Sequence, residues 1–393
     1  MVAPWYKAWH KTELTVNALS SKLKLQVPHD VFSTFRIDEG TLLLLDNLSD
    51  STPSSVLDMG CGYGALGLPI AAEFPKATVE MVDRDLLAVQ WAAENARTLS
   101  LPNAHVHGSL GFRDLSPGSY DWILCNVPAR IGRPFIENFF ENSLRRLNPG
   151  GEARVVVIRD LVLLLQEIGA AKSWAIEECG SGPRHSILRL PAAASAPADP
   201  SPILPPDLYL RDAVEVGGLT LERPFDLGGD DPQRLARGLP VLIDALPKKS
   251  PGRVLAFRCG YGSIPLMGLK RWPEARVTAV DRDLLATDFT RRNAARLSLA
   301  AKLTVLENSD LPDVLAGSRF DLIVGELSPS AGEAVAAAEW DAISKALAPG
   351  GQALVLTLDK LNREWMKPLI ARTGLAIHPV ISREGYTVLR LSS

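Results

Sequence analysis

Short hydrophobic runs alternate with longer amphipathic segments along the first half of the chain. Runs typical of strands lie at residues 56–59, 78–82, 105–107, 120–125 and 153–158, with a shorter candidate at 32–37. Apolar residues with helical spacing lie at 41–48, 66–72, 86–99 and 135–147. Strands that alternate with helices in this way predict a parallel sheet with helices on both faces.

The second half of the chain repeats this pattern together with many of its residues. Residues 258–262 match 60–64, and residues 280–285 match 82–87, both at an offset of 198 (258 − 60 and 280 − 82). Residues 320–324 also match 120–124, at an offset of 200 (320 − 120). The repeated unit has the length of a whole domain, so we predict a tandem duplication of one α/β domain rather than a solenoid.

A segment rich in proline and alanine separates the two copies and has no core-forming pattern. The chain of 393 residues is long enough for two domains that each bury a core. We therefore predict four regions, which are an N-terminal arm at 1–31, a first domain at 32–190, a linker at 191–206 and a second domain at 207–393.

Composition narrows the function classes. The chain carries 42 Lys and Arg against 45 Asp and Glu, a net charge of −3, which argues against broad nonspecific binding of a phosphate backbone. Its four cysteines have no metal-binding spacing, so we expect neither a metal site nor a disulfide framework. No apolar run has the length of a membrane span, and residues 1–7 lack the apolar core of a signal peptide. We expect a cytoplasmic protein without a membrane partner.

A glycine-rich turn follows the first core strand of the first half. Residues 58–64 read Asp-Met-Gly-Cys-Gly-Tyr-Gly, and glycines at alternate positions let the backbone turn tightly and approach a ligand. Asp83 ends the next strand, 19 residues after Gly64 (83 − 64), the spacing expected when a carboxylate binds ribose hydroxyls. The turn differs from the dinucleotide pattern G-x-G-x-x-G, because the preceding Asp58 would repel a pyrophosphate but attract an ammonium group.

With this loop, the acid, the later strand and a Pro-Gly-Gly turn, each half resembles a class I S-adenosylmethionine (SAM)-dependent methyltransferase. The first half resembles the small-methyltransferase-domain family over about residues 32–160, and a weaker copy covers 225–390. That family includes ribosomal RNA guanine-N2 methyltransferases built from two tandem domains, one of them degenerate. The resemblance implies an α/β fold of two tandem Rossmann-like class I methyltransferase domains, each a mostly parallel sheet flanked by helices. It also implies an enzyme that transfers a methyl group from SAM to an RNA base amine, with ribosomal RNA as partner.

The resemblance also implies roles for individual residues. The residues expected to lie around the methionine end of SAM are Asp58, Gly60, Cys61, Gly62 and Gly64. Asp83 would accept hydrogen bonds from the ribose hydroxyls, and Ser109 takes the place of the acid that usually binds the adenine amine. Asn126 would begin the family's N-P-P-[FYW] motif, in which the Asn oxygen holds the target amine in line with the methyl group.

The sequence departs from this motif after Asn126. Pro128 remains, but Val127 replaces the first proline and Ala129 replaces the aromatic residue that stacks on the base. We expect Arg130 or Phe135 to supply the missing substrate contact. The alternative is that residues 126–128 form a strand-ending loop with no catalytic role.

The second half lacks several of these groups. Ala256 replaces Asp58, Arg258 replaces Gly60 and Glu326 replaces Asn126, whereas Asp281 and Asp310 remain. We expect a scaffold or substrate platform there rather than a second active site. For the whole chain, the alternatives are a methyltransferase for a protein or small molecule and a SAM-binding pseudoenzyme.

Overall fold

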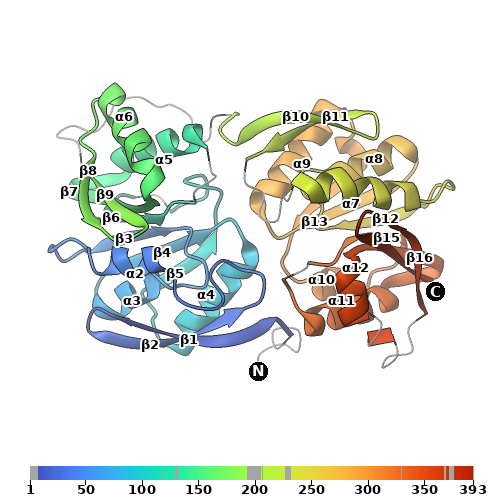
Figure 1. Ribbon diagram of the computed structural model, residues 1–393, viewed down its shortest axis with the longest axis horizontal. Helices are drawn as coiled ribbons and strands as arrows, with labels where there is room; N and C mark the ends of the chain where they lie inside the picture. Colours follow the sequence, from blue (N-terminus) through green and yellow to red (C-terminus); the bar gives the residue numbers. More distant parts are fainter. Residues whose placement is uncertain are drawn as a thin grey trace. The chain divides into compact units, whose positions relative to one another are not determined.

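The computed structural model describes residues 8–116, 118–128, 132–192, 205, 207–225, 232–328, 330–366, 369–370 and 376–392. The chain divides into two compact units (Figure 1). We call Lys11–Leu210 the first unit, and Arg211–Ser393 together with Met1–His10 the second unit. Most of the predicted linker, residues 193–204, lies outside the described residues, as do residues 1–7 of the predicted arm.

The first unit is built on a seven-stranded sheet with the order β5-β4-β3-β6-β7-β9-β8. Its strands are β3 Ser55–Met59, β4 Thr78–Asp83, β5 Ala104–Gly108, β6 Tyr120–Asn126, β7 Leu147–Ile158, β8 Glu177–Ser181 and β9 His185–Pro191. The strands β3 to β7 run parallel, and β9 is antiparallel to both of its neighbours. The predicted core strands and the mostly parallel sheet are confirmed.

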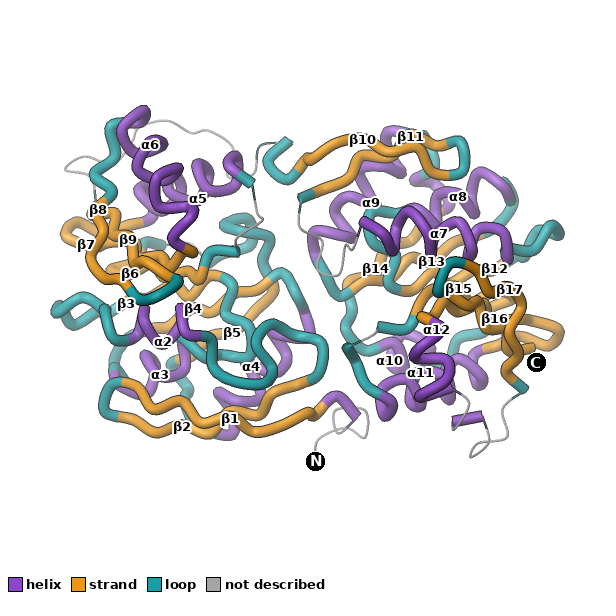
Figure 2. The backbone as a smooth tube through the Cα atoms, in the orientation of Figure 1, coloured by secondary structure: helices purple, strands orange, loops and turns teal. Residues whose placement is uncertain are grey.

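Helices flank this sheet, as the tube drawing shows (Figure 2). They are α2 Glu39–Leu45, α3 Gly67–Glu73, α4 Leu86–Thr98, α5 Arg133–Arg146 and α6 Val162–Lys172, with a 3-10 turn η1 at Arg159–Leu161. Asp85 caps α4 by accepting a hydrogen bond from the backbone of Leu87. Because α4 turns Leu87 and Trp91 inward, its apolar face is buried as the spacing predicts.

A hairpin of β1 His10–Ala18 and β2 Ser21–Pro28 precedes α2. The predicted strand at 32–37 is wrong, because residues 29–37 form turns and bends. Asp30 and Ser33 have positive φ angles of 64° and 56°, which interrupt an extended chain. Thr34 and Ile37 are buried three residues apart rather than at the alternate positions of a strand.

The second unit repeats this architecture, with the strand order β14-β13-β12-β15-β16-β18-β17. Its strands are β10 Leu210–Val216, β11 Leu219–Pro224, β12 Arg253–Phe257, β13 Arg276–Asp281, β14 Leu303–Glu307, β15 Phe320–Glu326, β16 Leu347–Leu358, β17 Ile377–Arg383 and β18 Tyr386–Ser392. Its helical segments are α7 Pro232–Ala245, α8 Ser263–Arg271, α9 Leu284–Arg296, η2 Ala300–Lys302, α10 Leu311–Leu315, α11 Glu333–Ala346, α12 Asp359–Leu361 and η3 Asn362–Met366. The expected duplication of one α/β domain is therefore confirmed.

The strand order places the two candidate motifs of the first unit side by side. The chain runs outward from β3 through β4 to β5 and then returns to β6 on the other side of β3. Met59 at the end of β3 pairs with Cys125 in β6. The glycine turn and Asn126 therefore leave neighbouring strands at the carboxyl edge, where open α/β sheets bind ligands. Among the described helices, none has the length and apolar character needed to cross a membrane.

Candidate functional site

The glycine turn after β3 borders open space. Gly60, Gly62 and Gly64 have φ angles of +79°, +56° and +98°. A Cβ atom added to Gly60 or Gly62 would meet no atom of the described residues within 4 Å, whereas one on Gly64 would lie 2.4 Å from Leu68. Gly64 is therefore required for packing, while Gly60 and Gly62 leave room above the backbone for a ligand.

Asp83 supports this turn from the end of β4. Its Oδ2 accepts a hydrogen bond of 2.9 Å from the backbone of Gly62, and its Oδ1 accepts one of 2.9 Å from Asp85. A carboxylate oxygen can accept more than one hydrogen bond, so this geometry is compatible with a further hydroxyl donor. Its predicted role towards a ribose remains a prediction.

Asp58 lies beneath the turn, with only 1% of its surface exposed. Its Oδ2 accepts a hydrogen bond of 2.8 Å from Gly67 at the start of α3. The pKa of Asp58 is raised to about 7, mainly by burial and also by the charge of Asp83, while the hydrogen bond from Gly67 opposes the shift. The structure shows Asp58 holding the turn against α3; its contact with a ligand stays a prediction.

The thiol of Cys61 lies within the turn and is buried. Its Sγ lies 3.6 Å from the carbonyl oxygen of Gly62. Burial raises the pKa of the thiol well above its usual value, with further contributions from Asp83 and Asp58. The thiol therefore stays protonated, and only the backbone of Cys61 lines the turn.

Asn126 is held in one orientation by residues that the sequence interpretation missed. Its Nδ2 donates to Asp38 Oδ2 over 2.9 Å and to Thr41 Oγ1 over 3.2 Å. Asp38 also caps α2 by accepting from the Thr41 backbone. Because an ionised carboxylate only accepts, it fixes which end of the amide is nitrogen and leaves Asn126 Oδ1 for another donor. The signal in the sequence was an N-cap Asp three residues before Thr.

The residue after Asn126 explains one departure from the expected motif. Val127 is buried, and its N–H donates to the carbonyl of Val156 over 3.0 Å. A proline there would remove this bond. Pro128 is exposed, and Gly132 caps α5 with a φ angle of 87°. Ala129 and the expected substrate contact Arg130 lie outside the described residues.

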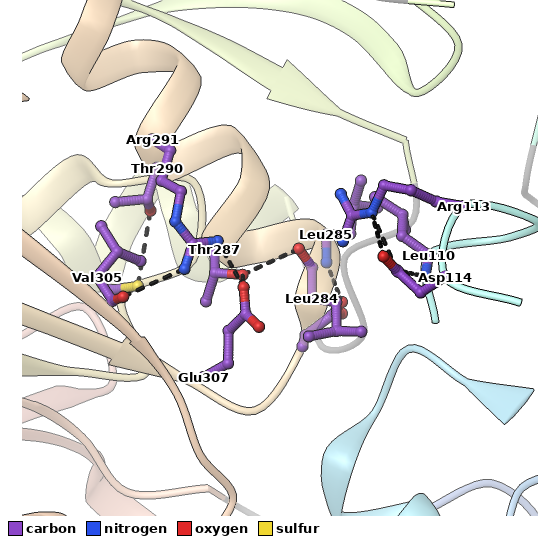
Figure 3. A network of polar contacts seen from close by, with 12 residues as sticks. Leu110, Arg113, Asp114, Leu284, Leu285, Thr287, Thr290, Arg291, Val305 and Glu307 are labelled. Carbon is purple, nitrogen blue, oxygen red and sulfur yellow. Dashed lines mark hydrogen bonds and ion pairs between the residues drawn. The ribbon is translucent and has the colours of Figure 1, made fainter. Parts of the chain in front are cut away.

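The other two candidates make contacts of their own. Phe135 is only 7% exposed, with ring centres 6.4 Å from Phe139 and 5.6 Å from Tyr209, so it would have to leave this cluster to touch a substrate. Ser109 Oγ donates to Gly111 over 2.7 Å and accepts from the Asp114 backbone over 3.2 Å. Ser109 therefore fixes the turn after β5, part of which is shown in Figure 3. Both assigned roles remain predictions.

The corresponding turn of the second unit is filled at the Arg258 position, whereas a Cβ atom added to Gly260, like one on Gly62, would meet no atom of the described residues within 4 Å. Arg258 donates to the carbonyl of Glu326 over 2.8 Å and to the buried carboxylate of Glu339 over 2.5 and 3.2 Å. The cavity bordered by these side chains has a volume of about 30 Å³. This is about the volume of one water molecule, whereas pockets for small ligands typically have about 300 to 1,000 Å³.

Two acidic residues, Glu307 and Asp310, also distinguish the second unit from the first. Glu307, which pairs with Asp281 as Gly108 pairs with Asp83, accepts hydrogen bonds from Thr287 and Arg291 (Figure 3). Asp310 is buried, and burial raises its pKa to about 6. Its Oδ1 has no hydrogen-bond partner in the described part of the chain.

The described residues contain no group of three or more His, Cys, Asp or Glu side chains that could hold a metal ion.

Comparisons with known proteins agree with this geometry. The model of the methyltransferase small domain family matches residues 22–168 and 232–390. YbxB of Bacillus subtilis (strain 168) is 34% identical over 129 residues, which cover 32% of this chain and 64% of that protein. The ribosomal RNA small subunit methyltransferase C of Hahella chejuensis is 34% identical over 157 residues, or 39% of this chain and 45% of that protein. The chain thus spans less than two thirds of the length of either relative.

One solved structure has a similar fold over the whole chain. The 16S rRNA N2 G1207 methyltransferase of T. thermophilus, solved in complex with AdoMet and guanosine, superimposes with a TM-score of 0.69 and 21% identity. The superposition covers 98% of this chain and 99% of that one. At this identity the likeness establishes a shared tandem fold.

Proposed function

The chain belongs to the methyltransferase small domain family, and from this premise we propose that it is a SAM-dependent methyltransferase with its active site in the first unit. One observation carries the proposal. The open glycine turn and the anchored Asn126 leave adjacent strands at the same edge of the sheet. The corresponding turn in the second unit is filled by an ion pair.

The residues of the first unit fit SAM. The space above Gly60 and Gly62 admits a ligand close to the backbone, and Asp83 places a carboxylate at the end of β4, where ribose hydroxyls would be bound. When bound, SAM supplies an electrophilic methyl group on a sulfonium. The chain's contribution is orientation, since Asn126 Oδ1 would accept a hydrogen bond from the target amine and hold its nitrogen towards the methyl group.

We propose that the acceptor is an amine of an RNA base, in particular N2 of guanine in ribosomal RNA. The support is the naming of the Hahella relative as a ribosomal RNA methyltransferase and the shared tandem fold. The second unit would then be a scaffold or substrate platform, and the protein would act in the cytoplasm. A net charge of −3 is more compatible with contacts to a few nucleotides than with electrostatic binding along a long stretch of the phosphate backbone.

Calorimetric titration of SAM into the full chain tests the cofactor assignment. We expect one site per chain, lost in a variant that fills the space above Gly60. Two sites would place a second working cofactor site in Arg211–Ser393, and no binding at millimolar SAM would overturn the methyltransferase proposal in favour of a pseudoenzyme.

The acceptor is tested by incubating the protein with methyl-labelled SAM and ribosomal subunits from cells that lack the corresponding gene. We expect label in RNA, recovered as N2-methylguanosine by mass spectrometry. Label found only in protein or in small molecules would replace the RNA assignment while leaving the methyltransferase intact.

A further inference from the structure

Two phenylalanines face solvent on the loop between β2 and α2 of the first unit. Phe32 is 70% exposed and Phe35 is 84% exposed. Their neighbours Thr34 and Ile37 are only 7% and 8% exposed, so the loop packs onto the protein while turning both rings outward. Two exposed rings on one well-packed loop are candidates for a binding surface.

The loop is fixed in place by contacts at several points. Ser33 Oγ donates to the carbonyl of Arg36 over 2.6 Å, and the Ser33 carbonyl accepts from the hydroxyl of Tyr63 over 3.1 Å. Tyr63 belongs to the glycine turn. At the other end of the loop, Asp38 accepts from Asn126 over 2.9 Å. The loop thus bridges the two parts of the site that we assign to SAM and to the acceptor.

These contacts place the rings within reach of the acceptor site. Phe35 precedes Asp38 by three residues, so their Cα atoms are at most about 11 Å apart even if the chain between them is fully extended. Asp38 in turn touches the amide of Asn126. A base bound at Asn126, or a nucleotide next to it, therefore lies within reach of the loop.

The surroundings of Phe35 match a surface for single-stranded nucleic acid. Lys11 Nζ lies 3.3 Å from the centre of the Phe35 ring and also donates to Thr34. A cation beside an exposed aromatic ring is the combination that such proteins use, because the ring stacks on a base while the cation attracts phosphate. The chain also has Ala129 where its family places the stacking ring, so an aromatic contact from elsewhere is needed.

We propose that Phe35, together with Phe32, stacks on bases of the single-stranded RNA segment that presents the target nucleotide to Asn126. This inference rests on the proposed function and specifies its substrate as unpaired RNA rather than a duplex. Stacking on any base is tolerant of sequence, so the two rings would add affinity, and Asn126 would select the amine.

The test compares Phe35→Ala, Phe32→Ala and the double variant with wild type in the full chain. The probe is a fluorescein-labelled single-stranded ten-nucleotide RNA containing one guanosine, read by fluorescence anisotropy, and SAM affinity is measured by calorimetry. Leu163→Ala is the matched control, because Leu163 is an equally exposed apolar side chain (72%) on α6. Both rings are exposed, so their removal leaves folding intact.

We expect each single variant to weaken RNA binding at least about fivefold and the double variant more. SAM affinity should stay within about twofold of wild type, and Phe35→Trp should keep wild-type RNA affinity. Unchanged RNA binding and methyl transfer in the double variant would overturn the inference while leaving the proposed function standing. If wild type binds SAM but neither binds nor methylates RNA, the RNA assignment and this inference both fail.

Discussion

The two units keep the same framework and differ where a ligand would enter. In the first unit, Asn95 Nδ2 donates to the carbonyls of Gln26 and Tyr63, both over 2.9 Å, and so ties the hairpin to the glycine turn. Asn293 makes the corresponding bonds in the second unit, to Glu222 over 2.8 Å and Tyr261 over 2.9 Å. The residues that hold the turn in place are thus shared, as is the carboxylate of Asp83 (Asp281), whereas Asp58, Gly60 and Asn126 are replaced in the second unit.

Where the two units differ, residues that contact each other are replaced together. The hydrogen bond from Gly67 to Asp58 in the first unit has no counterpart in the second, where Pro265 and Ala256 stand at an offset of 198 (265 − 67 and 256 − 58). The proline lacks the donor and the alanine lacks the acceptor, so neither leaves a buried polar group unsatisfied. Likewise Arg258 finds Glu339, at the position that Phe139 occupies in α5 (339 − 139 = 200). At these positions the second unit has a closed interior of paired side chains in place of the open turn.

Copying the arginine into the first unit should have the largest effect. The φ angle of Arg258 is 49°, which shows that this turn accommodates a side chain, so we expect Gly60→Arg to fold. Its guanidinium would enter the space above the turn, and SAM binding should fall by about a thousandfold or more. Calorimetry measures this, with Gly150→Arg as control, since Gly150 also has positive φ and open space around its Cβ position. Normal SAM binding by Gly60→Arg would refute the location of the site.

Removing the ion pair of the second unit should have the next largest effect. Arg258→Ala leaves the buried carboxylate of Glu339 without its partner, at a cost of about 3–5 kcal/mol in unfolding free energy. Urea denaturation followed by circular dichroism measures this cost. Arg133→Ala is the control, because its exposed pair with Glu137 should contribute less than about 0.5 kcal/mol. The double variant Arg258→Ala/Glu339→Leu should recover most of the loss, and a stable single variant would contradict the closed-interior interpretation.

Asn126→Ala should separate binding from transfer. We expect methyl transfer to RNA to fall about a hundredfold, because the target amine loses its acceptor and its orientation. SAM affinity should remain within about twofold. Glu326→Ala, at the corresponding position of the second unit, should transfer at the wild-type rate. Labelled-methyl assays at saturating SAM measure both variants, and full activity of Asn126→Ala would remove this residue from the mechanism.

The two strand-end carboxylates offer a symmetrical test. Asp83 and Asp281 hold their glycine turns with equal bonds of 2.9 Å, but Arg258 enters the turn beside Asp281 whereas the turn beside Asp83 has Gly60 at that position. Asp83→Ala should weaken SAM binding about 10- to 100-fold by removing charge-assisted hydrogen bonds, whereas Asp281→Ala should leave affinity unchanged within about twofold. Equal losses in calorimetry would show that both turns bind SAM.

The smallest effect concerns pH. Burial raises the pKa of Asp58 to about 7 in the folded chain, against roughly 3.9 when unfolded. Between these values the folded chain holds a proton that the unfolded chain has released, so stability falls as pH rises through this window. From about pH 6 to 8 we expect a loss of about 1 kcal/mol that Asp58→Asn abolishes.

The corresponding position in the second unit is Ala256; in that unit burial raises the pKa of Asp310 to about 6 and also raises the pKa of Asp281. The loss of unfolding free energy that Asp310 causes as pH rises should therefore be complete about one pH unit lower than the loss caused by Asp58. The variant Asp310→Asn should abolish it. Urea unfolding curves at several pH values test both residues. Identical pH dependence in wild type and Asp58→Asn would show that Asp58 titrates normally.

Local patterns predicted the fold well, because strands and amphipathic helices record burial in their own spacing. The glycine turn and the duplication were predicted from residue identities, since the glycines stand at alternate positions and the matched residues recur at a fixed offset. Local patterns could not predict contacts between distant segments. Asp38 and Asn126 are 88 residues apart, and Arg258 and Glu339 are 81 apart. Nor could they show that Phe135 is buried while Phe35 is exposed, since a single phenylalanine beside a motif gives no sign of its own burial in the sequence.

The pairing of Arg258 with Glu339 also makes this turn hard to open by a single substitution. A single change of Arg258 to glycine would open the turn but leave the buried carboxylate of Glu339 unpaired. A single change of Glu339 would leave the guanidinium of Arg258 unpaired. We therefore expect either single substitution to destabilise the second unit. The ion pair thus protects the closed form of this turn against single substitutions of either partner.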